Sequence, residues 1–124
     1  MLEDIGTHLQ AHALGSVGTD LFLGLMPDDP DNCTALFEYA GSPPDLHWEG
    51  EYPGLQVRVR NTSYQAGRAV IESIYDLLHG IFDTDLSGTK YLLIKAQGSP
   101  EVLKRDQNNR IEWFINFAII KERE

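Results

Sequence analysis

The stretch Leu55-Gln56-Val57-Arg58-Val59-Arg60 alternates apolar residues with long polar ones at a period of two. This alternation predicts a β-strand with one face in a core and the other face in water. After a break at residues 61–63, apolar residues recur every three or four positions as far as residue 81. That longer period predicts an amphipathic helix of about four turns. We expect the remaining segments to form layers around this strand and helix.

Residues at both ends of the predicted helix are typical of helix caps. Thr62 and Gln65 match a capping box, in which the two side chains bond free N–H groups of the first turn. Gly80 suits the left-handed residue that often follows a last turn. Nearer the N-terminus, residues 2–14 place an apolar stripe on one face and predict a second, shorter helix.

Four further segments complete the predicted sheet, and three others connect its elements. Residues 20–26 and 34–39 are short apolar runs separated by a turn-rich segment, and we expect them to be neighbouring antiparallel strands. Residues 91–97 and 111–121 predict two more strands, the second one long and central, joined by a polar hairpin tip at 98–110. Residues 41–54 contain three prolines and three glycines and predict a long loop. A turn is expected at 83–88.

This pattern predicts an α+β fold in a single domain over residues 1–124. We expect a mostly antiparallel, or mixed, sheet of about five strands flanked by two helices. A chain of this length can bury a core of its own without a disulfide or a metal. Its one cysteine excludes an intrachain disulfide.

The charge of the chain excludes some classes of function. Nineteen acidic and ten basic residues give a formal net charge of −9, which opposes tight binding to nucleic acid phosphates. No apolar run is long enough to span a membrane, and the first residues lack the basic and apolar segments of a signal peptide. We therefore expect a soluble protein made in the cytoplasm that does not enter a membrane.

Three groups of residues could support chemistry, and each has a more ordinary structural interpretation. Two histidines four positions apart can bind a metal, but no third ligand follows at a useful spacing. An acidic turn offers oxygens to calcium, but it lacks the glycine and the distal glutamate of an EF-hand. A lone cysteine beside a strand is more often a small core residue than a nucleophile. The histidine pair is His8 with His12, the acidic turn contains Asp28, Asp29 and Asp31, and the cysteine is Cys33. We expect no catalytic residue, no metal and no cofactor.

Two arginines of the first strand are more informative. Arg58 and Arg60 lie with Gln56 on the face opposite the apolar residues, in a chain that has few cations. They either guard a solvated sheet face or bind carboxylates of a neighbouring subunit with paired hydrogen bonds. Under the second hypothesis, changing both arginines to glutamate leaves the monomer folded and prevents assembly. Gln56, Arg58 and Arg60 are therefore candidate subunit-interface residues.

Apolar residues in the two turn-rich segments are candidates for docking a partner. Leu46, Trp48 and Tyr52 lie in the predicted loop at 41–54, and Val102 and Leu103 lie in the polar segment before the last strand. Exposed aromatic residues are favoured at protein interfaces. Each of these residues packs either on its own domain or on another chain.

Several of these segments together resemble a known family. Residues 20–30 (DLFLGLMPDDP), 38–44 (EYAGSPP) and 52–61 (YPGLQVRVRN) are similar to members of the minor capsid or tail terminator family of long-tailed bacteriophages. The helix with Tyr64 and Ala66 near its start, and the final strand with Asn116 and Phe117, extend the resemblance to residues 1–123. Residues 52–61 with the following helix are the most specific part.

The resemblance implies a structural virion protein. Such proteins close the end of a phage tail tube as a ring, usually of six copies, and offer the opposite face to the head connector. The implied partners are further copies of the chain, the major tail tube protein and a head-completion or connector protein. DNA would cross the lumen without tight binding, and the protein would be found in the virion neck after assembly in the host cytoplasm. The alternatives are a related connector or stopper of the neck, or a small cytosolic binding or catalytic domain.

Overall fold

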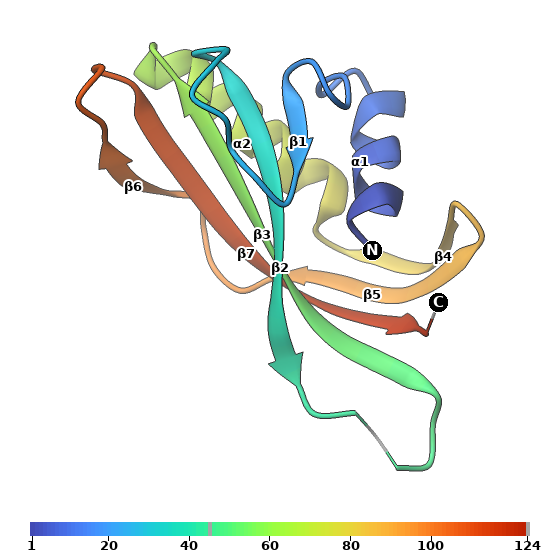
Figure 1. The fold of residues 1–124 in the computed structure, drawn as a ribbon. Helices are drawn as coiled ribbons and strands as arrows, with labels where there is room; N and C mark the ends of the chain where they lie inside the picture. The colour runs from blue at the N-terminus through green and yellow to red at the C-terminus, as the bar shows by residue number, and fades with distance from the viewer. Residues whose placement is uncertain (45, 124) are drawn as a thin grey trace.

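The computed structural model describes residues 1–44 and 46–123. Within these residues two helices and seven strands follow one another along the chain (Figure 1). Their bounds are α1 (Leu2–Ala11), β1 (Leu21–Leu23), β2 (Cys33–Ser42), β3 (Gly50–Asn61), α2 (Tyr64–Leu78), β4 (Ile81–Leu86), β5 (Thr89–Ala96), β6 (Glu101–Arg105) and β7 (Ile111–Glu122).

The strand and helix at the centre of the sequence form as predicted, with a shift at the helix start. Ser63 caps α2, because its side-chain oxygen accepts a hydrogen bond from the backbone nitrogen of Ala66 at 3.2 Å. The predicted Thr62 cap is wrong by one residue: the backbone nitrogen of Thr62 donates to Asn32 Oδ1 at 3.0 Å. Gly80 has a φ of +91°, which confirms the left-handed residue beyond the helix.

The sheet is larger than predicted and contains one parallel pair. Its strand order is β1-β2-β3-β7-β5-β4, and β6 pairs with β7 beside this path. The long last strand is central as predicted, since it pairs with β3, β5 and β6. The predicted count of about five strands is too low because β4 and β6 lie in segments whose sequences predict turns. β1 pairs with β2 in parallel, so the predicted antiparallel pairing is wrong.

The hydrophobic core lies between the sheet and the two helices. Leu55, Val57 and Val59 of β3 are at most 1% exposed, which confirms the buried face of the alternating stretch. From α2 the core receives Ile71, Ile74 and Leu78. From α1 it receives Ile5 and Leu9. Both helices thus cover one face of the sheet, and we call the opposite face the open face.

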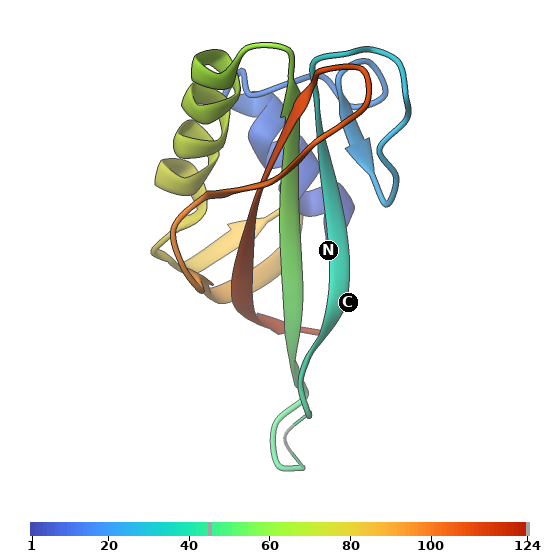
Figure 2. The same ribbon diagram turned by 90° about the vertical axis from the view of Figure 1, so that its left-hand side faces the viewer.

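β2 and β3 continue as a hairpin whose tip extends beyond the rest of the sheet, while the inner side of β3 stays paired with the end of β7 (Figures 1 and 2). We call the described residues 38–44 and 46–54 the hairpin arm. The loop predicted at 41–54 is therefore wrong at both ends, because β2 extends to Ser42 and β3 begins at Gly50. The strands can form here although prolines lack a backbone donor, since Pro43 and Pro44 follow the end of β2 and Pro53 has no partner in the register of β3 with β2 or β7.

Gly67 provides a test of the packing between α2 and the sheet. A Cβ atom added there would lie 3.0 Å from Nε1 and 3.1 Å from Cδ1 of Trp113, whose side chain is buried. We expect Gly67→Val to lower the free energy of unfolding by about 1–3 kcal/mol, because the indole must move in a filled core. Ala69→Val, on the exposed side of the same helix, is the control and should cost about 0.5 kcal/mol. Equal effects in urea denaturation would contradict this packing.

Candidate functional site: the open face and the hairpin arm

A chain of polar side chains crosses the open face from β3 to β7. Arg58 Nε donates to Gln56 Oε1 at 2.7 Å, and Gln56 Nε2 donates to Asn116 Oδ1 at 3.0 Å. The Arg58 guanidinium also lies over the ring of Phe37, 4.9 Å from its centroid. Among the described residues, no hydrogen bond or ion pair occupies the two terminal nitrogens of Arg58. The arginine is half-buried and held in place, with donors left for another molecule.

These residues line a shallow trough on the open face. The trough is lined by Phe37, Glu38, Gln56, Arg58, Gln97 and Asn116. Tyr39 borders the trough, and its hydroxyl donates to Gln97 Oε1 at 3.0 Å. Burial raises the pKa of Tyr39, so this hydroxyl stays protonated as the donor at neutral pH. A second hollow continues from Tyr39 and Gln97 along the arm past Ala118 and Ile120.

Arg60 differs from Arg58 although both are on the open face. Its side chain is only 4% exposed. Nε donates to the carbonyl of Asp31 at 3.0 Å, and Nη2 donates to the carbonyls of Pro27 and Pro30 at 2.6 and 2.7 Å. The expectation that Arg60 faces solvent is wrong, because the loop between β1 and β2 folds over it. Arg60 therefore holds this loop within its own chain.

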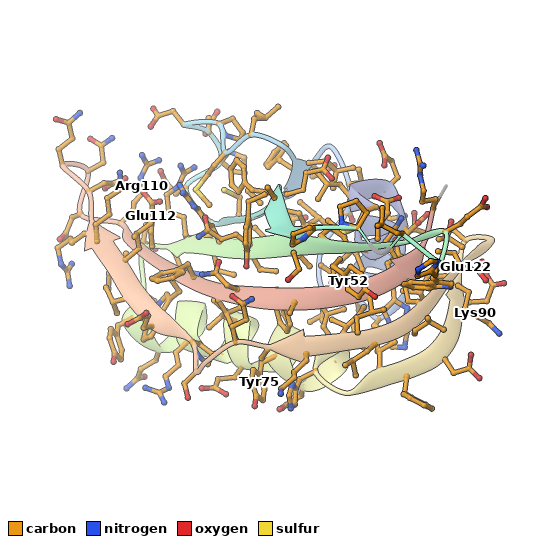
Figure 3. All side chains as sticks on the ribbon, turned by 90° about the horizontal axis from the view of Figure 1, so that it is seen from below. Tyr52, Tyr75, Lys90, Arg110, Glu112 and Glu122 are labelled. Atoms are coloured by element: carbon orange, nitrogen blue, oxygen red, sulfur yellow. The ribbon has the colours of Figure 1, made fainter. Side chains whose placement is uncertain are left out.

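A second buried arginine, Arg110, binds the acidic side chains around the same loop. Its Nη2 pairs with Asp28 Oδ1 at 2.6 Å, its Nη1 with Asp31 Oδ1 at 3.3 Å, and its Nε with Asp106 Oδ2 at 2.8 Å. The hydrogen bond to Asp28 raises the pKa of Arg110 further above its usual value. The backbone and side chain of Arg110 lower the pKa of Asp106. Figure 3 places Arg110 with Glu112 at the end of the sheet opposite Glu122 and Lys90.

The three groups considered for chemistry occupy ordinary structural positions. His12 Nδ1 lies 3.0 Å from the carbonyl of His8, and burial followed by the nearby His12 lowers the pKa of His8. The Cys33 thiol is buried, and burial raises its pKa, which disfavours the reactive thiolate. In residues 1–44 and 46–123, no group of three histidine, cysteine or acidic side chains is placed to hold a metal ion.

The hairpin arm is stiffened by aromatic rings that lie against glycines. Tyr39 packs on Gly54, and Trp48 packs on Gly50; a side chain at either glycine would overlap the ring. Trp48 also meets Tyr52 edge-on, with ring centroids 5.8 Å apart. Trp48 and Tyr52 are thus half-buried within the arm itself. Leu46, near its tip, is 95% exposed.

Val102 and Leu103 lie on β6, apart from the arm. Every residue of β6 is exposed, and these two side chains are 44% and 41% exposed. The strand is joined to the sheet by its pairing with β7. The candidate residues therefore lie on three surfaces: the trough with Gln56 and Arg58, the adjoining arm with Leu46, Trp48 and Tyr52, and the β6 edge.

Sequence reasoning missed Arg110, Asn116 and the contact between Tyr39 and Gln97. Arg110 and Asp28 are 82 residues apart, and no local pattern connects them. The one available signal for Asn116 was its place on the polar side of an otherwise apolar strand.

No helix among the described residues is long and apolar enough to cross a membrane.

Comparison with known proteins places the chain in a family. The family model described as bacteriophage tail terminator protein matches residues 8–123. A chain in the solved virion of a native gene transfer agent particle has the same fold, with a TM-score of 0.71. Their sequences are 17% identical, and the match covers 98% of this chain and 94% of the other. No curated protein matches this sequence. The chain belongs to the bacteriophage tail terminator family, a family of structural phage proteins.

Proposed function

We propose that this chain is a tail terminator that assembles as a ring, of six copies, on the end of a phage tail tube. The ring closes the tube and offers its other face to the head connector. The observation that carries this proposal is the family match over residues 8–123. A ring of identical subunits repeats one heterologous contact around an axis and closes on itself. The protein acts as a structural part of the neck and catalyses no reaction.

The subunit contact includes the trough residues Gln56 and Arg58. Copies with a net charge of −9 repel one another unless basic groups lie at their contact. Arg58 supports this role because its terminal nitrogens are available and its position is fixed by Gln56 and Phe37. Arg60 does not belong to this contact, since its donors are used within the chain.

The ring also contacts the tail tube protein and the connector, and DNA passes through its lumen. The exposed Val102 and Leu103 on β6 are proposed to dock one of these partners. The acidic chain lacks the basic clusters that grip phosphates. Any attraction to DNA should therefore be weak and be lost with moderate salt.

Native mass spectrometry of complexes between this chain and tails tests the proposal. We expect six copies of 13.9 kDa on each tail tube end. A single copy per particle, or copies bound only to head complexes, would contradict the terminator ring and favour the alternative of a connector or stopper.

Arg58→Glu should block ring assembly while the monomer stays folded. The substitution replaces the available donors with a carboxylate that repels the next acidic copy. Arg68→Glu is the matched control, because Arg68 is an exposed residue of α2 that pairs with Glu72 away from the open face. The two variants should share an unfolding midpoint, and only Arg58→Glu should lose the ring in native mass spectra. Rings of normal stability formed by the Arg58→Glu variant would show that the open face is merely solvated.

A further inference from the structure

We propose that the hairpin arm of one copy lies in the trough on the open face of the next copy. This inference rests on the proposed function, because it specifies which two surfaces of the same chain meet in the ring. It identifies the partner of the arm as a second copy of this chain.

The outer edge of the arm and its tip have little support from their own domain. On the inner side β3 still pairs with the end of β7 at Gly50 and Glu51. Residues of β2 from Glu38 to Ser42 are all exposed, and the tip of the arm projects past the remaining strands (Figure 2). An exposed strand edge presents unpaired backbone groups that a partner can cover. The packing of Tyr39 on Gly54 and of Trp48 on Gly50 stiffens the arm. A stiff arm loses less conformational entropy when it docks.

Charge complementarity between the acidic arm and the basic side chains near the trough favours the trough as the binding site of the arm. Residues 38–54 contain four acidic residues and no lysine or arginine, and one of the four, Glu51, pairs with Lys121 of its own chain at 3.4 Å. The trough holds Arg58 with its terminal nitrogens available, and Lys95 is exposed on the same face, opposite Ala118 in the register. A carboxylate of an incoming arm can accept two hydrogen bonds from the Arg58 guanidinium. DNA is disfavoured as a ligand of the arm by the same four acidic residues.

The trough and the arm also both carry exposed apolar side chains that could contact each other. The trough and the adjoining hollow expose parts of Phe37, Phe114, Ala118 and Ile120. The arm offers Leu46, which is 95% exposed, beside Pro43 and Pro44. Docking would remove both apolar surfaces from water while it pairs the acidic residues of the arm with Arg58.

A photo-crosslinking amino acid in place of Leu46 tests this arrangement, because a side chain this exposed can be replaced without disturbing the fold. The experiment uses full-length protein on assembled tails, with isotope-labelled and unlabelled copies mixed. We expect crosslinks between two copies that map to β3 near Gln56 and Arg58 or to β7 near Asn116. Adding Arg58→Gln, which removes the charged donor without adding a repelling carboxylate, should reduce their yield by about tenfold or more in particles that still carry six copies, as loss of a charge-assisted hydrogen bond implies. Adding Arg68→Gln should leave the yield unchanged.

Two results would overturn the inference. One is a crosslink from position 46 to the tail tube protein, to a connector or to another part of the chain. The other is an unchanged yield with Arg58→Gln. Either result is compatible with a terminator ring as long as native mass spectra still show six copies. Loss of the six-copy complex from the unsubstituted protein would instead refute the proposed function itself.

Discussion

Replacing Arg60 with leucine should lower the free energy of unfolding by about 3–5 kcal/mol, because several polar groups on the loop between β1 and β2 lose their buried donor. The guanidinium donates to three backbone carbonyls of this loop, and its side chain is 4% exposed. Leucine fills part of the space but donates nothing. Since domains have about 5–15 kcal/mol of stability, a loss of this size can leave much of the chain unfolded.

Urea denaturation followed by tryptophan fluorescence measures this effect. Arg60→Lys should be destabilised as well, since one ammonium group cannot match the planar fork that reaches three carbonyls. Arg58→Leu is the control on the same strand face and should change stability by less than about 1 kcal/mol. If Arg60→Leu were no less stable than Arg58→Leu, the loop would not depend on the buried arginine.

The expected loss of stability at position 60 also determines how the two arginines can be tested. Changing both to glutamate is expected to unfold the chain through residue 60 before any assembly defect can be observed. Only the single substitution at Arg58 separates assembly from folding.

Loss of the protein should abolish infectivity, which is the largest effect we expect. A stop codon in place of Gln10 would leave the tube without the ring that we propose. An uncapped tube presents the same contact after each added layer, so its growth has no structural end point and its end does not match the connector. We expect heads without tails together with tubes of irregular length in electron micrographs.

Expression from a plasmid provides the controls for this experiment. The unsubstituted chain and Arg68→Glu should restore plaques, and Arg58→Glu should not. Normal plaque titres from the stop-codon phage would contradict a role in completing the tail.

The parts of the fold that sequence predicted best are those with long, regular apolar periods. β3, α2 and β7 each bury one face against the same core, so their patterns follow directly from burial. β6 is exposed along its whole length, and β4 is exposed at half of its positions. Neither strand therefore shows an alternation. β1 has three residues, too few to indicate whether its pairing is parallel.

The candidate site could be predicted only in part. The alternation correctly placed Arg58 and Arg60 on the open face, but it could not show which of them a distant loop covers. The carbonyls that bind Arg60 lie 29 to 33 residues earlier in the chain. The strands of the arm could not be predicted for a different reason, because its prolines and glycines are typical of loops. Those glycines instead accommodate the rings of Tyr39 and Trp48.

Cryo-electron microscopy of the virion neck can show the proposed ring itself. We expect six copies of this fold in one ring between the tail tube and the connector, with DNA or an open channel on the axis. Density for this chain elsewhere in the particle, or at the neck without a closed ring, would contradict the proposal.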